Sequence, residues 1–235
     1  MDATTRADAA TEIQRIFSAY RAAQPTDTGM LAALTDGKLY ELYVLSQLVT
    51  DLAGRGFTLQ FVPSVVPTGS AAAMHSTLKF KASPGMIKST DSHFEVRCPD
   101  PSMPICYLFL NIEFDTLGHS KNAASDNSRR HELDIILTWA SSGYPTHSQI
   151  ALGVECKAVA NFEKGLVKEA LGVRRELSYV QGDQDSIPSQ LGGHPIKMVP
   201  ANPPSEFMVA FIDPKGQNYE ESPKAFGIDF MHMQP

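Results

Sequence analysis

The sequence predicts an α/β protein, because helix-like and strand-like hydrophobic patterns follow one another along its 235 residues. Apolar residues three and four positions apart predict helices over 37–53 and about 161–180. Alternating or continuous apolar residues predict strands between these helices and after the second one. A chain of this length commonly folds around a single core, so we expect the helices to pack on one sheet.

Composition indicates an ordinary globular protein, with 43% hydrophobic and 20% charged residues. The net charge of -6 supplies no overall positive field, so binding of nucleic acid would need a local basic patch or bound metal ions. The 3 cysteines show no zinc-site spacing, which favours reduced thiols and a cytoplasmic location. The N-terminus is polar, unlike a secretory signal, and no apolar run approaches the ~20 residues that cross a bilayer, so no membrane partner is expected.

A helix is expected near the N-terminus, over residues 4–23, where four apolar side chains form a short stripe. A polar segment with proline and glycine, 24–29, then interrupts the chain. We therefore expect an N-terminal helical extension over residues 1–30 and an α/β domain over residues 31–235.

The helix over 37–53 carries a carboxylate, Glu41, inside its apolar stripe. Thr35 or Asp36 is a suitable N-cap for this helix. A carboxylate in line with buried leucines costs several kcal/mol unless something compensates it. The alternative is a first-turn glutamate that is favoured by the helix dipole and still reaches water. The leucines that define the stripe are Leu45, Leu48 and Leu52.

Four strands are expected in the first half of the α/β domain, separated by loops that contain proline. They cover residues 57–62, 76–81, 93–98 and 105–116. The last of these strands alternates between apolar and polar residues. Its buried face should consist of Leu108, Leu110, Ile112 and Phe114. Its opposite face should be wet and consist of Asn111, Glu113 and Asp115, with a role of Glu113 beside a metal as the less favoured alternative.

A strand over 131–138 follows, with Asp134 at the mouth of an apolar run. In a regular strand, His131 lies on the opposite face from Asp134. We therefore expect a structural role for His131, with a phosphate contact as the less favoured alternative. The faces of this strand alternate, with one of them made by Leu133, Ile135 and Leu137.

The strand over 150–158 pairs with the previous one as a hairpin through the loop 141–145. Side chains alternate along a strand, so Glu155 and Lys157 share one face near its end. Charged residues are rarely buried unless they are paired or bind a metal. The alternative is a strand end in solvent with a weak ion pair. The other face should be wholly apolar, with Ile150, Leu152, Val154, Cys156 and Ala158.

The last third of the chain offers a helix from Asn161, its expected N-cap, to about Val180. One side of this helix should carry an apolar core stripe, and the opposite side should carry a line of basic residues exposed to solvent. The composition of residues 181–205 predicts a long irregular loop, and the apolar residues within 206–213 predict a buried strand. The residues after Pro214 show only weak patterning. The core stripe contains Leu166, Ala170, Val173 and Leu177. Lys164, Lys168 and Arg175 line the far side, and a purely solvated role is expected for Lys168 and Arg175.

Three carboxylates and one lysine thus occupy positions where the surrounding pattern makes a charge costly. Glu41, Asp134 and Glu155 are oxygen ligands of the kind that Mg²⁺ prefers, and the backbone carbonyl of Cys156 could add another. Mn²⁺ is expected to substitute. A bound metal activates water and neutralises negative charge, and a neighbouring lysine, Lys157, can hold or deprotonate that water. This combination is suited to phosphodiester hydrolysis.

The spacing Asp134 … Glu155-Cys156-Lys157 resembles the signature of the PD-(D/E)xK nuclease superfamily, which has the restriction-endonuclease-like fold. The resemblance spans about residues 37 to 213. It implies a mixed central β-sheet flanked by helices, with an αβββαβ core. Glu41 matches the acidic residue that many members place on the first core helix.

Two departures from the superfamily pattern concern the residue before the aspartate and the helix after the lysine. Leu133 stands where many members have proline. The Gln-x-x-x-Tyr motif of some exonuclease-like branches is absent, and the corresponding helix offers Arg175-Glu-Leu-Ser-Tyr179. This argues against a processive exonuclease that acts on DNA ends.

The resemblance implies a Mg²⁺-dependent endonuclease that hydrolyses phosphodiester bonds in DNA, with a restriction or anti-phage defence role by analogy. Arg129, Arg130 and Lys164 are the expected contacts to the nucleic-acid backbone. Targeting would come from a homodimer or a partner protein. One alternative is a nuclease that acts on RNA or branched nucleic acid, and another is a non-catalytic nuclease-fold subunit that binds nucleic acid.

Overall fold

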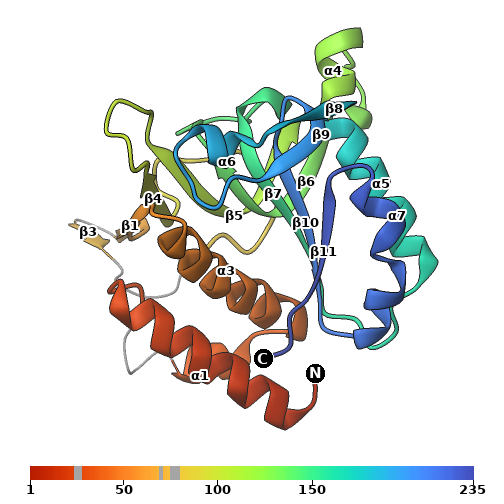
Figure 1. Cartoon of the computed structure of the whole chain (residues 1–235). Helices are drawn as coiled ribbons and strands as arrows, with labels where there is room; N and C mark the ends of the chain where they lie inside the picture. The colour runs from red at the N-terminus through yellow and green to blue at the C-terminus, as the bar shows by residue number, and fades with distance from the viewer. Residues whose placement is uncertain (24–27, 69–70, 75–79) are drawn as a thin grey trace.

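The computed structural model describes residues 1–23, 28–68, 71–74 and 80–235, which form an α/β fold with a mixed central sheet and flanking helices (Figure 1). This confirms the expected fold class at that level. The strand expected over 76–81 lies largely outside the described residues. Among the described helices, none has the length and apolar character needed to cross a membrane.

The central sheet has seven strands in the order β1-β4-β5-β6-β7-β10-β11. Neighbours from β1 to β7 pair antiparallel, whereas β10 pairs parallel with both β7 and β11. The strands are β1 (Thr58–Val62), β4 (His93–Arg97), β5 (Cys106–Asp115), β6 (Arg130–Thr138), β7 (Ile150–Lys157), β10 (Glu206–Phe211) and β11 (Ile228–His232). Two small antiparallel pairs lie outside it, β2 (Val65–Thr68) with β3 (Ala71–Met74) and β8 (Tyr179–Asp185) with β9 (Met198–Asn202).

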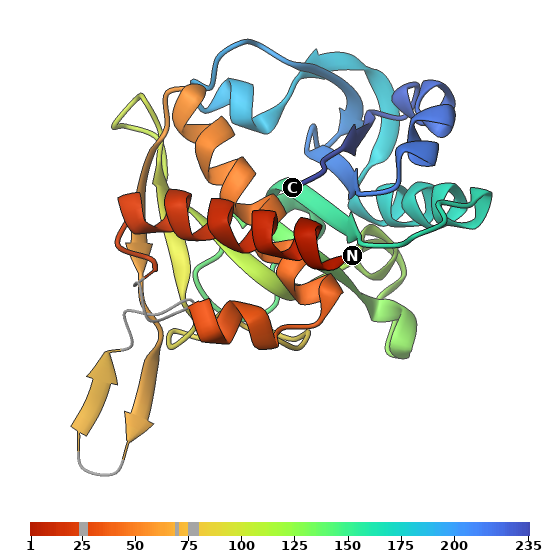
Figure 2. The same ribbon diagram turned by 90° about the horizontal axis from the view of Figure 1, so that it is seen from below.

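Three helices determine how the sheet is covered: α1 (Ala3–Ala19), α3 (Asp36–Gly54) and α5 (Lys164–Leu177). The Thr35 side chain accepts from Lys38 N and caps α3, as expected. Figure 2 shows α1 lying against the outer side of α3. Shorter helical turns are α2 (Thr28–Ala33), α4 (Leu117–Asn122), η2 (Asn127–Arg129), η3 (His147–Gln149), α6 (Ile187–Gln190), η4 (Pro214–Tyr219) and α7 (Glu221–Lys224).

Two hydrophobic layers enclose the sheet. The α3 layer contains the buried side chains of α1 and α3, together with one face of the strands, such as Leu152 and Met208. The α5 layer contains Ala170, Val173 and Leu177 of α5 and the opposite face of β10 and β11. Because α1 shares the layer of α3, the apolar stripe of the N-terminal helix is part of the main core.

Strands β5 and β6 change layers halfway along their length. Leu108 and Leu110 belong to the α3 layer, but Ile112 and Phe114 belong to the α5 layer, so the expected single buried face is wrong. The reversal occurs at Asn111, which has a φ of 53°. This left-handed conformation turns the strand and is uncommon outside glycine.

The partner strand reverses at the same point: the register pairs Leu110 with Ile135 and Ile112 with Leu133, on either side of Asn111 and Asp134. Leu133 is in the α5 layer and Ile135 in the α3 layer, although the alternation predicted one face for both. Asn111 itself is fully buried rather than wet. A register shift beside Thr138 likewise places Ile150 in the α5 layer, away from Leu152 and Val154.

Two expectations for the last third of the chain are wrong, and a segment for which no element was expected forms a strand. Asn161 does not cap α5, which begins after Glu163, and its side-chain amide donates to the Glu163 carboxylate instead. Residues 181–205 contain most of the β8–β9 pair and α6 rather than an irregular loop. The weakly patterned end of the chain supplies β11, an edge strand of the sheet. The expected strand at 206–213 is confirmed as β10.

Candidate active site

A cleft of about 580 Å³ lies between the end of β7, the first half of β6 and one side of α5. Three predicted site residues, Asp134, Glu155 and Lys157, line this cleft together with Cys156. The geometry of the cleft depends on Gly153, which lies two residues before Glu155 on the same face of β7. A Cβ at Gly153 would lie 2.9 Å from Leu133 Cδ1, so the missing side chain lets the α5 layer pack closely behind the charged residues.

Asp134 stands where β6 and β7 separate. The last backbone pair of this ladder joins Ile135 to Val154. Beyond it, the Cys156 N–H donates to Asp134 Oδ2 at 2.7 Å, so a side-chain carboxylate replaces the backbone acceptor. Burial raises the pKa of Asp134, although this hydrogen bond and the charge of Lys157 oppose the rise.

Glu155 is buried beside Lys157, whose Nζ lies 2.9 Å from Glu155 Oε2. Burial raises the pKa of Glu155 to about 7, and the nearby Asp134 charge adds to the rise while Lys157 opposes it. Lys157 Nζ also donates to Glu169 Oε1 on α5 at 2.6 Å. Burial alone would lower the pKa of Lys157, but the two carboxylates hold it above its usual value. The ammonium is therefore charged and fixed between β7 and α5.

Glu41 points inward from α3 and is only 7% exposed, which confirms its place in the buried stripe and excludes the alternative of a solvated glutamate. Lys38 Nζ lies 2.9 Å from both Glu41 oxygens and 2.6 Å from Asn111 Oδ1. Burial raises the pKa of Glu41, Lys38 opposes the rise, and the charge of Asp134 adds to it. The charge of Asp134 thus affects the pKa of Glu41, but the Glu41 side chain lines a separate small pocket together with Lys81 and does not line the cleft.

The three residues expected to contact a nucleic-acid backbone do not line the cleft. Arg129 and Arg130 both donate to Asp115 Oδ1, at 3.0 and 3.1 Å. Arg130 also stacks over the ring of Tyr144. Lys164 is exposed at the start of α5, and Lys168 and Arg175, further along the helix, are exposed as well. The expected solvated basic face of α5 is thereby confirmed.

His131, which was expected on the side of β6 away from Asp134, is exposed and lines the same cleft. The reversal of β6 at Asp134 explains this difference. The cleft walls are predominantly acidic, so a polyanion would be repelled unless cations were bound. The carboxylates that line it are Glu132, Asp134, Glu155, Glu169 and Glu176.

Within the described part of the chain, no three His, Cys, Asp or Glu side chains are arranged to hold a metal ion. The chemistry of the donors nevertheless suits a hard divalent cation. Asp134 and Glu155 are carboxylates whose charged forms are disfavoured by burial, and a cation between them would reverse that effect. Mg²⁺ usually takes one or two carboxylates, keeps several waters and binds substrate phosphate, so two protein carboxylates are sufficient.

Sequence reasoning did not identify Lys38, Asn111 or Glu169 as parts of this site. Lys38 precedes Glu41 by three residues, a spacing at which helical side chains meet, so a pair could have been predicted. Glu169 is twelve residues from Lys157, on another element, and only the packing of α5 brings them together. Comparison of the chain with protein-family models, curated proteins and solved structures gives no match.

Proposed function

We propose that this protein is a divalent-metal-dependent nuclease that hydrolyses phosphodiester bonds, with DNA as the expected substrate. The observation that carries the proposal is the cleft in which Asp134, Glu155 and Lys157 meet at the separating ends of β6 and β7. Buried carboxylates beside a fixed ammonium are costly for folding, and such clusters of perturbed groups in a cleft are typical of active sites.

The order of elements supports the resemblance to the PD-(D/E)xK superfamily. The elements α3, β5, β6, β7, α5 and β10 occur in the order αβββαβ, with β1 and β4 of the same sheet and several smaller elements inserted between them. In this arrangement, Glu41 belongs to the first helix, Asp134 to the second strand, and Glu155 and Lys157 to the third. These are the places that the resemblance implies.

Each residue has a separate role in the proposed reaction. Asp134 and Glu155 would hold Mg²⁺, with the Cys156 carbonyl as a further oxygen donor. When bound, the metal would supply a more acidic water and neutralise charge on the phosphate. Lys157 would donate hydrogen bonds to the attacking water or to the phosphate oxygen that gains negative charge. Glu169 would orient Lys157 from α5 through their 2.6 Å contact.

Glu41 would enter the site only if its carboxylate left Lys38. The Lys38 ammonium contacts three oxygens, two from Glu41 and one from Asn111, so it occupies the position that a cation would take beside Glu41. Burial raises the pKa of Glu41, and the charge of Asp134 adds to the rise. A second, weaker metal position involving Glu41 is therefore part of the proposal.

Cleavage assays with the full chain test this function. Supercoiled plasmid, linear duplex DNA, single-stranded DNA and RNA are incubated with Mg²⁺, with Mn²⁺ or with a chelator. Metal-dependent cutting is expected, and Lys157→Ala should lower its rate by roughly 100-fold or more, as for loss of a group that assists proton transfer. Lys224→Ala, which removes an exposed lysine paired with Glu221 at the surface, serves as the matched control.

The substrates distinguish the remaining alternatives. Cutting of RNA but not DNA would show that the same site acts on RNA, which is the first alternative. Full activity in folded Lys157→Ala would refute the assignment of the site. Binding of nucleic acid without cleavage in the presence of either metal would favour the non-catalytic subunit. This subunit is the second candidate because the cleft is acidic and because Arg129 and Arg130 are paired with Asp115.

A further inference from the structure

A second cavity, of about 610 Å³, opens on the other face of the sheet. Helix α3 packs on β1, β6 and β7 (Figure 1), and its residues Gln47, Leu48, Asp51 and Arg55 line the cavity. Its floor consists of Leu152, Met208 and Met231, from three adjacent strands. One wall is the C-terminal half of α3, and the other is the segment 195–198 that leads into β9. We call this cavity the α3 groove.

Apolar and deformable side chains dominate the α3 groove. Four methionines from three segments of the chain line it: Met198, Met208, Met231 and Met233. Methionine is flexible and polarizable, so such walls adapt to the shape of an apolar ligand. Ile196, Met198 and Met231 are 61%, 51% and 43% exposed, respectively. Large apolar side chains gathered around one opening are typical of binding sites.

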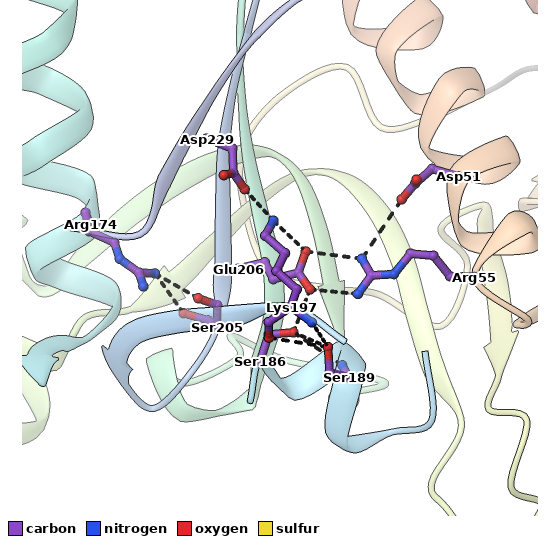
Figure 3. A network of polar contacts seen from close by, with 9 residues as sticks. All are labelled: Asp51, Arg55, Arg174, Ser186, Ser189, Lys197, Ser205, Glu206 and Asp229. Atoms are coloured by element: carbon purple, nitrogen blue, oxygen red, sulfur yellow. Dashed lines mark hydrogen bonds and ion pairs between the residues drawn. The ribbon is translucent and has the colours of Figure 1, made fainter. Parts of the chain in front are cut away.

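The charged residues that line the α3 groove form a network of ion pairs (Figure 3). At its centre is Glu206, which is 3% exposed and accepts hydrogen bonds from both terminal nitrogens of Arg55, at 3.1 and 2.8 Å. Lys197 Nζ donates to Glu206 at 3.0 Å, and the Ser186 hydroxyl donates at 2.7 Å. Both cations of the groove are therefore engaged by one buried carboxylate.

Two further carboxylates remain at the mouth of the α3 groove. Asp229 shares Lys197 with Glu206, and its side chain is 36% exposed. Asp51 lies 4.0 Å from Arg55, and its side chain is 59% exposed. The groove therefore has three carboxylates, Asp51, Glu206 and Asp229, for two cations, and the surplus negative charge faces solvent at its mouth.

We propose that the α3 groove binds a small molecule with an apolar body and a primary or secondary ammonium group. The apolar body would lie on Leu152 and the methionines, and the ammonium would donate to Asp229 and Asp51. An anionic head would meet these carboxylates instead and would be rejected. The groove volume is in the range of ligand pockets of small molecules. This proposal does not depend on nuclease activity.

The methionines provide the readout of the test. The full chain is labelled with ¹³C at the methionine methyl groups and titrated separately with octylamine, octanol and octanoate. Octylamine should shift the signals of Met198, Met208, Met231 and Met233. Met86 and Met103 are 42% and 39% exposed elsewhere and serve as internal controls that should not move.

The three probes share one apolar chain, so their affinities isolate the effect of the head group. Octylamine should bind most tightly and octanoate most weakly. In Asp51→Asn, octylamine should bind about fivefold more weakly, as expected for loss of one partly exposed ion pair, while octanol should be unaffected. Asp229→Asn should act in the same direction, and Asp100→Asn, at an exposed site, is the control.

Four results would overturn the proposal. The first is octanoate binding as tightly as octylamine. The second is a shift of Met86 and Met103 together with the groove methionines, which would indicate non-specific adsorption. The third is a shift of the groove signals with protein concentration alone, which would indicate that a second copy of the chain covers the groove. The fourth is the absence of any shift with octylamine.

Discussion

The Cys156 N–H donates a 2.7 Å hydrogen bond to Asp134 Oδ2 across the gap that opens at the end of the β6–β7 ladder. Asp134 thus has a structural role in addition to its proposed role as a metal ligand. Its neighbours along this gap are the residues with the most perturbed charges in the cleft, Glu155 and Lys157. The two roles of Asp134 can be separated by choosing the substitution.

Asp134→Asn should abolish metal-dependent cleavage but keep the fold, because the amide oxygen can still accept from Cys156 N. Asp134→Ala should also lower the free energy of unfolding by about 1–3 kcal/mol, since the Cys156 N–H loses its acceptor. Urea denaturation and cleavage assays on both variants measure the two effects. Equal stability of the two variants would refute the structural role of the carboxylate.

Glu155→Gln should stabilise the protein at alkaline pH. The folded pKa of Glu155 is about 7 against a usual 4.5, so the folded state binds an extra proton between these values and stability falls as pH rises through them. Without the ionisable group, this loss disappears. The variant should gain about 1–3 kcal/mol at pH 8, or roughly 3–9 °C in Tm, and little at pH 4.

Differential scanning calorimetry at both pH values measures this gain. Glu163→Gln is the matched control, because Glu163 is exposed at the start of α5. A gain in Tm that is the same at pH 4 and pH 8 would show that the carboxylate charge is not its cause. Mg²⁺ should raise the Tm of the wild type but not of Glu155→Gln, since ligand binding to the folded state alone is stabilising.

Glu206→Gln should destabilise the fold strongly at neutral pH. Burial alone would raise the pKa of Glu206, but hydrogen bonds and charge from Arg55 and Lys197 hold it below its usual value. Breaking such a buried pair from one side costs about 3–5 kcal/mol. A depressed pKa means that this stability is present above the usual value of 4.5 and is lost as the pH falls through the folded pKa.

Thermal unfolding from pH 7 down to pH 3 should therefore show the Tm of the wild type converging on that of Glu206→Gln. Glu221→Gln, whose carboxylate is 92% exposed and paired only with Lys224, should track the wild type throughout. A difference between wild type and Glu206→Gln that stayed constant with pH would argue against a charged Glu206.

Asn111→Gly and Asn111→Ala form a pair that isolates the backbone at this position. Both variants lose the contacts of Asn111 with Lys38 and Glu41. Only glycine accepts the left-handed φ of 53° without a steric penalty. Asn111→Ala should therefore be less stable than Asn111→Gly by about 1–2 kcal/mol in urea denaturation. The reverse order would mean that β5 does not keep this conformation in the variants.

Hydrophobic patterning is sufficient to predict the existence of the elements that are rich in buried apolar side chains, namely α3, β5, β6, β7, α5 and β10. It fails for β8, whose residues are exposed along nearly its whole length because it pairs only with β9 outside the main sheet. It also fails for β11, a short edge strand of mixed polarity. Neither strand has the apolar signature of a core element.

The candidate site is predictable for the same reason and to the same extent. Glu41 is marked by its apolar neighbours on α3, and Glu155 and Lys157 by theirs on β7. The reversal at Asn111 depends on one backbone torsion, which alternation of side chains does not reveal. The contact of Lys157 with Glu169 depends on how α5 packs against β7, and the hydrophobic pattern of either element alone does not determine this packing.

The change of layers at Asn111 and Asp134 has a consequence for how the molecule unfolds. Each of β5 and β6 supplies buried side chains to both layers: Leu110 and Ile135 belong to the α3 layer, whereas Phe109 and Ile136 belong to the α5 layer. Neither layer can come apart without disturbing strands that also belong to the other. The two halves of the core should therefore melt as one cooperative unit, and amide protons of α3 and α5 should exchange with solvent through the same global opening.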